Sequence, residues 1–133
     1  MIEYSKQNKK AWEYNAYDFW CIHNGVPAAL AEKLTALDGI RINGSHAAPH
    51  VLSIGIPGVP TQNSINILQD HGICVSAGSA CAKGHRSHVL EAMKVAPEVI
   101  DGTFRVSICR DTTEAELEQL YTVIRDEILP RAR

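Results

Sequence analysis

Residues 104–109 form the clearest predicted β-strand in the sequence, and this strand constrains the fold more than any other stretch. Apolar side chains recur at every second position, namely Phe104, Val106 and Ile108. Successive side chains of a strand point to opposite faces, so Arg105 and Cys109 must point away from the apolar side. The fold therefore needs a sheet that buries one face against other elements.

Similar short segments, separated by glycine, proline and polar residues, fill the rest of the chain. Further strands are predicted at residues 40–42, 51–56 and 73–76. Helices are predicted from apolar spacing and capping residues at 8–23, 27–39, 61–70, 87–94 and 113–130. Four short strands and about five helices fit an α+β fold of two layers, in which helices stand on one face of a small, largely antiparallel sheet.

The first twenty residues hold six of the eight aromatic side chains. One face of the predicted first helix carries Trp12, Ala16, Phe19 and Trp20. This stripe packs into the core, or it covers a surface meant for a partner or a second copy of the chain, because so much aromatic area is poorly suited to water. We expect an aromatic helical leader, residues 1–26, and one domain, residues 27–133, with a homodimer through the leader as one expected assembly.

Charge and hydropathy exclude several classes of protein. The 133 residues carry a formal net charge of -2 without a long run of one sign, so no footprint for nucleic acid is present. No apolar run is long enough to cross a membrane, and the N-terminus lacks the layout of a signal peptide. We therefore expect a soluble, cytoplasmic protein.

The cysteines of such a protein are expected to be free thiols, because the cytosol is reducing. The four are Cys21, Cys74, Cys81 and Cys109. None of them forms a CxxC pair, which disfavours a thioredoxin-type redox motif or a zinc ribbon. Cys74 lies on the Ser76 face of its predicted strand and is expected to be inert.

Cys81 lies in the segment that most suggests chemistry. Small residues around Gly78 interrupt the predicted strand and leave Cys81 outside regular structure. The cationic residues that follow are Lys83, His85 and Arg86. Ser87 is suited to cap a new helix. Positive charge and a helix N-terminus both favour the thiolate over the thiol, so the sequence predicts a reactive cysteine.

Three stretches together resemble one family. They read Val-Ser-Ala-Gly-Ser-Ala-Cys at 75–81, Ser-His-Val-Leu-Glu-Ala-Met at 87–93 and Phe-Arg-Val-Ser-Ile-Cys-Arg-Asp-Thr-Thr at 104–113. From about Pro27 to Pro130 the chain resembles the C-terminal small domain of pyridoxal-phosphate-dependent cysteine desulfurases, within class V aminotransferases. The resemblance implies that Cys81 is the persulfide-forming cysteine and that Arg105 binds the substrate carboxylate. It also implies a place in sulfur transfer, as in iron–sulfur cluster assembly.

The same resemblance implies what this sequence lacks. The family holds its cofactor on a preceding large domain, through a lysine that directly follows a histidine, and this chain has no His-Lys dipeptide. We expect no pyridoxal phosphate bound by this chain alone and no desulfurase turnover without a large domain. The chain is then a natural remnant or an expressed fragment, or a recombined reading frame.

The leader supports the last of these interpretations. Its run Lys-Ala-Trp-Glu-Tyr-Asn-Ala-Tyr at 10–17 resembles the start of some bacterial S-adenosylmethionine-dependent methyltransferases. The likeness covers about twenty-five residues, and no glycine-rich cofactor loop follows. It implies a borrowed leader without methyltransferase activity.

Two other functional classes remain open. In the first, Cys81 accepts a persulfide from a donor protein, and the chain is a non-enzymatic sulfur carrier or scaffold. In the second, Cys81, His85 and His88 share a metal ion, with a fourth ligand from His46, His50 or His71. Gly84 argues against a helix between those ligands, so no metal ligand is assigned.

Several residues near these motifs are accessory candidates. His85 and His88 are placed to carry protons near the thiolate, although exposed histidines are the more common interpretation. Ser79 belongs to the same signature as Cys81. Arg110 is a second candidate for the carboxylate, and Cys109 is expected to be a buried structural thiol.

Overall fold

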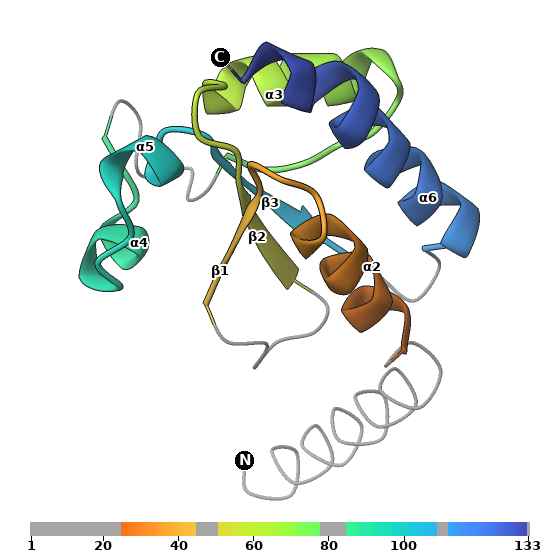
Figure 1. Ribbon diagram of the computed structural model, residues 1–133, viewed down its shortest axis with the longest axis horizontal. Helices are drawn as coiled ribbons and strands as arrows, with labels where there is room; N and C mark the ends of the chain where they lie inside the picture. Colours follow the sequence, from red (N-terminus) through yellow and green to blue (C-terminus); the bar gives the residue numbers. More distant parts are fainter. Residues whose placement is uncertain (1–24, 45–50, 78–84, 109–111, 133) are drawn as a thin grey trace, which may run out of the picture.

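A three-stranded antiparallel sheet lies at the centre of the computed structural model, which describes residues 25–44, 51–77, 85–108 and 112–132 (Figure 1). The strands are β1 (Arg41–Asn43), β2 (Val51–Gly55) and β3 (Thr103–Ser107), in that order across the sheet. Ile42 pairs with Ile54, and Ile54 pairs with Phe104, so the apolar side chains of all three strands share one face. Residues 1–24, which include the whole of the predicted aromatic helix, lie outside the described residues.

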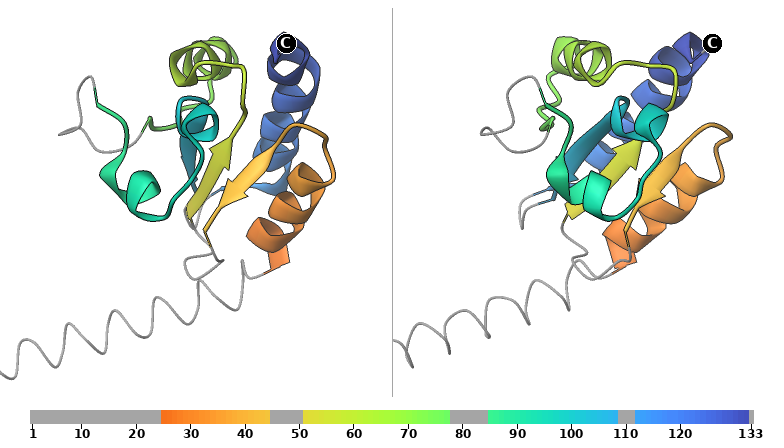
Figure 2. Two further views of the ribbon diagram at one scale, coloured as in Figure 1. Left: turned by 60° about the vertical axis from the view of Figure 1, so that its left-hand side comes forward. Right: turned by 90° about the vertical axis from the view of Figure 1, so that its left-hand side faces the viewer.

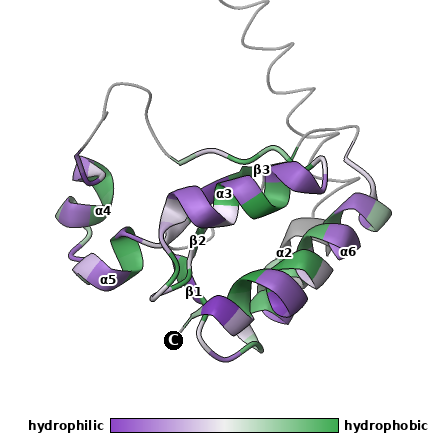
Figure 3. Ribbon diagram, turned by 90° about the horizontal axis from the view of Figure 1, so that it is seen from above, coloured by the Kyte–Doolittle hydropathy of each residue, from purple (hydrophilic) through white to green (hydrophobic). Residues whose placement is uncertain are grey.

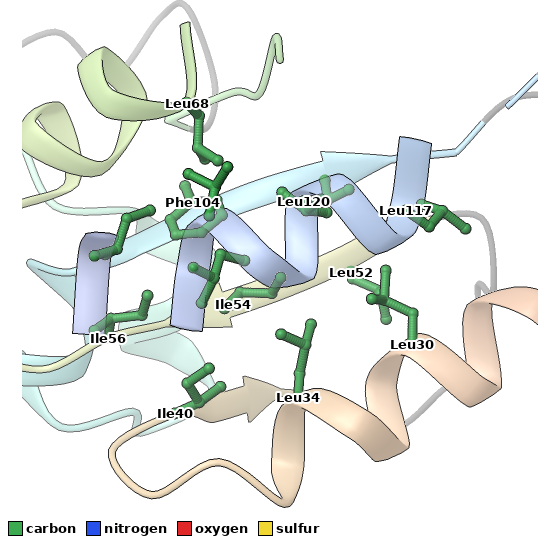
Figure 4. Close-up of a cluster of buried hydrophobic side chains, with 14 of the residues drawn as sticks. Leu30, Leu34, Ile40, Leu52, Ile54, Ile56, Leu68, Phe104, Leu117 and Leu120 are labelled. Atoms are coloured by element: carbon green, nitrogen blue, oxygen red, sulfur yellow. The ribbon is translucent and has the colours of Figure 1, made fainter. Parts of the chain in front are cut away.

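The apolar face of the sheet is covered by three helices, α2 (Gly25–Thr35), α3 (Thr61–Asp70) and α6 (Glu114–Val123). Figure 4 shows Leu34 from α2, Leu68 from α3 and Leu120 from α6 pointing toward Ile54 and Phe104 on the strands. All five side chains are at most 2% exposed. Burial of such side chains contributes roughly 1.5–3 kcal/mol each and is the main force that joins the layers.

The predicted α+β class is confirmed, and the three longer described helices stand on one face of the antiparallel sheet. Two short helices, α4 (His88–Ala92) and α5 (Pro97–Ile100), lie on the other side of the sheet (Figure 2). A Cβ on Gly55 would lie 2.5 Å from Cγ1 of Val99, so α5 packs directly against the backbone of β2. The sequence did not predict α5, which spans only four residues.

Local signals set the helix ends. The hydroxyl of Thr113 accepts a hydrogen bond from the Glu116 amide, and the Glu116 carboxylate accepts one from the Thr113 amide, which confirms the predicted capping box of α6. At the start of α4 the Ser87 hydroxyl accepts a hydrogen bond from the Leu90 amide, without a reciprocal side-chain bond. α3 has the predicted bounds, whereas α2 ends at Thr35, before the expected Gly39. The Thr35 hydroxyl bonds back to the last turn of α2, and Gly39 takes a φ of 94° that directs the chain into β1.

The predicted strand at residues 73–76 is wrong. Among the described residues, these four do not form a continuous ladder with another strand. Only Ser76 forms a bridge, to Arg105 of β3. The preceding residues are still closing α3, because the amides of Gly72 and Ile73 donate to the carbonyls of Gln69 and Leu68. This arrangement is a Schellman motif, with Gly72 at a φ of 76°. The predicted alternation is nonetheless present, since Ile73 and Val75 pack on the core and Cys74 is exposed.

The C-terminal helical segment is amphipathic, with hydrophilic and hydrophobic residues both present along α6 (Figure 3). One face of the segment carries apolar side chains that are buried, namely Leu117, Leu120, Ile124 and Ile128. Tyr121 is half-buried, and the Lys33 ammonium lies 4.6 Å from the centre of its ring. The α-helical pattern ends at Val123 and continues as the π-helix η1 (Ile124–Ile128) and the 3-10 helix η2 (Leu129–Arg131). Pro130 lacks an amide donor and cannot extend an α-helical ladder.

Candidate functional site

Arg105 lies in the middle of β3 and points away from the core, as the sequence predicts. On one side it pairs with Ser53 of β2. On the other its amide donates to the Ser76 carbonyl at 2.7 Å and its carbonyl accepts from the Ser76 amide at 3.0 Å. The backbone is therefore held from both sides, while the exposed guanidinium pairs with no carboxylate among the described residues. Such a group is available to an anionic ligand.

A row of polar side chains crosses the same outward face. The Asn43 amide donates to the hydroxyls of Ser53 at 3.2 Å and of Thr103 at 3.1 Å. The Thr103 hydroxyl in turn donates to the Val99 carbonyl at 2.6 Å. These bonds fix a polar surface beside Arg105 and tie it to α5. The sequence alone does not predict this role of Asn43, because its partners are distant in the chain.

Both described ends of the segment that contains Cys81 form hydrogen bonds with β3 or with the residues just before it. Ser76 bonds to Arg105, and Arg86 grips Asp101 with two hydrogen bonds of 2.7 and 2.9 Å, from Nε and a terminal guanidinium nitrogen. These bonds hold the pKa of Asp101 below its ordinary value, and the hydrogen bond to the Asp101 carboxylate raises the pKa of Arg86. The sequence predicts that the charge of Arg86 favours the thiolate of Cys81. In the structure this charge is instead compensated by Asp101.

Four of the predicted residues lie outside the described residues: Cys81, Ser79, Cys109 and Arg110. Cys74 is described, and its thiol is free and exposed. It precedes Ser76 on the outward side of the chain. The structure thus places Ser76, near one end of the segment that carries Cys81, beside Arg105, while Arg86 at the other end pairs with Asp101.

The two accessory histidines are exposed. Nδ1 of His88 lies 3.9 Å from a carboxylate oxygen of Glu91, one turn along α4, which is too long for a hydrogen bond. His85 immediately follows the undescribed part of the Cys81 segment. Within the described ranges, no group of three histidine, cysteine or acidic side chains is placed to hold a metal ion.

His71, a candidate fourth ligand, has a different partner. Its Nε2 lies 2.7 Å from Oε1 of Glu127, and this pair connects the end of α3 to η1. The pair borders an open groove of about 470 Å³ lined mainly by α6 and η1. The groove belongs to the helical layer, on the side of the sheet away from Arg105. His46 and His50 lie outside the described residues.

The described residues do not fit pyridoxal phosphate. Their two lysines are Lys33 and Lys94. Lys33 pairs with Glu118 at 2.6 Å and belongs to the helical layer behind the sheet. Lys94 is exposed and follows α4 at a φ of 59°. Neither side chain has a recorded contact with Arg105 among the described residues, so no cofactor chemistry is assigned to this part of the chain.

Among the helices of the described residues, none has the length and apolar character needed to span a bilayer.

Comparison with known proteins gives a consistent result. The model of the family described as aminotransferase class-V matches residues 15–120. A cysteine desulfurase of Nostoc sp. is 35% identical over 104 residues, which are 75% of this chain and 26% of the relative. Cysteine desulfurase IscS of Photorhabdus laumondii is 30% identical over 108 residues, covering 78% of this chain and 26% of the relative. The chain thus spans about a quarter of the length of these relatives.

Solved structures agree with the fold. A NifS-like protein superposes with a TM-score of 0.67 at 30% identity, over 80% of this chain and 27% of that protein. A NifS-like protein from Rickettsia africae gives a TM-score of 0.63 at 27% identity, over 77% of this chain and 28% of its own.

Proposed function

Because this chain belongs to the aminotransferase class-V family, we propose that it is the C-terminal part of a cysteine desulfurase. In this proposal Arg105 binds the carboxylate of a cysteine substrate, and Cys81 accepts its sulfur atom. The observation that carries the proposal is the exposed guanidinium of Arg105, which pairs with no carboxylate among the described residues, on a backbone held between Ser53 and Ser76.

Arg105 is suited to bind a carboxylate because its backbone is fixed from both sides, while its exposed guanidinium pairs with no carboxylate in the part of the chain that the structure describes. A planar guanidinium grips a carboxylate through two parallel hydrogen bonds, which a lysine ammonium cannot reproduce. The polar row of Asn43, Ser53 and Thr103 is already hydrogen-bonded within the protein, so it offers a rigid surface beside the bound ligand.

Chain length supports the pairing of Cys81 with Arg105. Cys81 follows Ser76 by five positions, and Ser76 is bonded to Arg105. Five residues span at most about 18 Å when fully extended. The Cα atom of Cys81 therefore stays within this reach of Ser76. As a thiolate, Cys81 would form a sulfur–sulfur bond while the carbon–sulfur bond of the substrate breaks.

The reaction also needs a group that receives the electron pair left on carbon. The part of the chain that the structure describes offers no such group, so the proposal assigns it to a large domain loaded with pyridoxal phosphate. The chain alone is then inactive, and the large domain is its first partner. Sulfur would next pass to an acceptor protein, as in iron–sulfur cluster assembly.

Complementation tests this proposal. The chain is mixed with a large-domain fragment of the Nostoc sp. relative loaded with pyridoxal phosphate, and cysteine-dependent alanine formation is measured. We expect alanine from the mixture and none from either component. Cys81→Ser is expected to abolish alanine formation, and Arg105→Lys to reduce it at low cysteine concentration. Equal rates for wild type and Cys81→Ser would reject the role of Cys81.

A second proposed function is a non-enzymatic sulfur carrier, which needs the thiol of Cys81 but no lysine for a cofactor. In this alternative a full-length desulfurase transfers a persulfide to Cys81. Mass spectrometry after incubation with an active donor checks it. An added sulfur atom on wild type and its loss in Cys81→Ser are expected, and equal labelling of the two proteins would remove this function.

The proposal extends to location and assembly. A cytoplasmic location agrees with the free, exposed thiol of Cys74, which suits a reducing compartment. The division into residues 1–26 and 27–133 and the homodimer through the leader stay predictions. Size measurement of the full chain and of a form that begins at residue 27 checks both.

A further inference from the structure

Ser53 lies directly beside Arg105 on the outward face of the sheet. The two residues are opposite each other in the register of β2 and β3. The Cβ atoms of residues directly opposite in an antiparallel pair lie about 4.5–5.5 Å apart, on the same face. Ser53 is half-buried, whereas Arg105 is exposed. A ligand bound between the Arg105 side chain and the sheet therefore lies within reach of the Ser53 hydroxyl.

A chain of hydrogen bonds fixes which groups donate on this face. It begins at the Val99 carbonyl, which can only accept, so the Thr103 hydroxyl donates to it at 2.6 Å. With its one hydrogen committed, Thr103 can only accept from Asn43, which must present its amide nitrogen at 3.1 Å. The same nitrogen lies 3.2 Å from the Ser53 hydroxyl oxygen. Because an amide nitrogen does not accept, the Ser53 hydroxyl is the acceptor of this bond too.

This polarity leaves the hydrogen of the Ser53 hydroxyl available. A serine hydroxyl has one hydrogen to donate and two lone pairs that accept. Asn43 uses one lone pair, and among the residues that the structure describes the Ser53 hydroxyl donates no hydrogen bond. The Thr103 hydroxyl differs, because its hydrogen is given to Val99 and its side chain is buried. Of these two hydroxyls, Ser53 is therefore the one that can donate to a ligand.

We propose that Ser53 is a second carboxylate-binding residue, whose hydroxyl donates a hydrogen bond to the carboxylate that Arg105 grips. This role rests on the proposed function of Arg105. The two oxygens of a carboxylate accept about four hydrogen bonds, of which the guanidinium fork uses two, so an acceptor position remains for the hydroxyl. Asn43 is the positioning residue of this site, because its bond directs the Ser53 hydroxyl. Donors alone face the ligand, which suits an anion that only accepts.

Binding of acetate to the full chain tests the proposal. Acetate is the probe because it carries the carboxylate alone, so the assay needs neither cofactor nor large domain. The chain is labelled with nitrogen-15, and the Nε–H signal of the Arg105 side chain is followed by NMR during titration with sodium acetate at constant ionic strength. Arg105→Lys identifies this signal by its loss. The signal is expected to shift in a saturable way, which gives a dissociation constant.

Ser53→Ala is expected to raise the dissociation constant for acetate about three- to tenfold, because a partly exposed hydrogen bond to a charged group is lost. Ser53→Cys, which has a weaker donor of similar size, is expected to shift it in the same direction. Ser53→Thr keeps the hydroxyl and is expected to stay within about twofold of wild type. Ser107→Ala is the matched control, because Ser107 lies on the same face of β3 but opposite Val51, and it is expected to change nothing. Urea unfolding of each variant verifies that the sheet is intact.

An unchanged dissociation constant in Ser53→Ala and Ser53→Cys would overturn the proposal, and so would an equal weakening in Ser107→Ala. A wild-type Arg105 signal that acetate does not shift would overturn it as well. Because alanine formation is measured separately, a chain that binds acetate through Ser53 and fails complementation rejects the proposed function and leaves the carboxylate site in place.

Discussion

The close approach of Gly102 to Ile56 gives the sharpest test of the packing beside the site. A Cβ at position 102 would lie 2.1 Å from the Ile56 carbonyl oxygen, 2.8 Å from its carbonyl carbon and 2.9 Å from the Val59 carbonyl oxygen. All three atoms belong to the backbone, so no side chain can rotate away. The Ile56 amide also donates to the Gly102 carbonyl at 3.0 Å, and a shift would strain that bond.

Gly102→Ala is therefore expected to lower the free energy of unfolding by about 3 kcal/mol, the upper end of the usual cost of overpacking. Urea unfolding followed by circular dichroism measures this change. Gly72→Ala is the matched control, since the same methyl group there meets nothing within 4 Å. Gly72 has a φ of 76°, so its substitution is expected to cost about 1 kcal/mol through backbone conformation alone.

A loss below about 1 kcal/mol in Gly102→Ala would refute the reasoning, because the overlap with the Ile56 backbone would then be relieved cheaply. Equal losses at both glycines would do the same. The result bears on the site, since Gly102 connects Asp101, which holds Arg86, to Thr103 in the polar row.

Three further predictions follow from single interactions. Ser64→Ala is expected to raise the free energy of unfolding by about 1 kcal/mol in urea, because the buried Ser64 hydroxyl has no hydrogen-bond partner among the described residues; a loss would contradict this. Thr113→Ala removes the cap of α6 and is expected to cost about 1 kcal/mol, with no change if the capping box is unimportant. The folded pKa of Asp101 lies below its ordinary value of 3.8, so the Arg86 pair stabilises the fold above about pH 4 and is lost as pH falls through the folded value. Thermal unfolding of Asp101→Asn is accordingly expected to depend less on pH below pH 4 than that of wild type, and parallel curves would contradict the assignment.

Short-range patterns predicted the elements well. α3 has the expected bounds, because a proline precedes it and a glycine closes it within a few residues. Ser87 and Thr113 cap the helices they were expected to cap, since a cap depends on neighbours three positions away. Arg105 faces outward because successive side chains of a strand point to opposite faces, and its apolar neighbours occupy the buried face.

Short-range patterns could not predict contacts between residues that are far apart in the sequence. Asn43 bonds to Thr103, sixty positions away, and nothing near Asn43 in the sequence distinguishes this role from that of a turn residue. The charge of Arg86 was expected to favour the thiolate of Cys81. Its pairing with Asp101 could not be predicted, because the pairing depends on how α4 and α5 return to the sheet. The strand expected at residues 73–76 failed because the chain is still closing α3 there.

The central claim is that Arg105 and Cys81 act together on one substrate. Its most direct test is the sulfur content of the Cys81 peptide after complementation, measured by mass spectrometry for wild type and for Arg105→Lys at limiting cysteine. The account predicts an added sulfur atom on Cys81 of wild type and much less on Arg105→Lys, because lysine cannot form the carboxylate fork. Equal sulfur on both proteins, or none on wild type while alanine is formed, would contradict it.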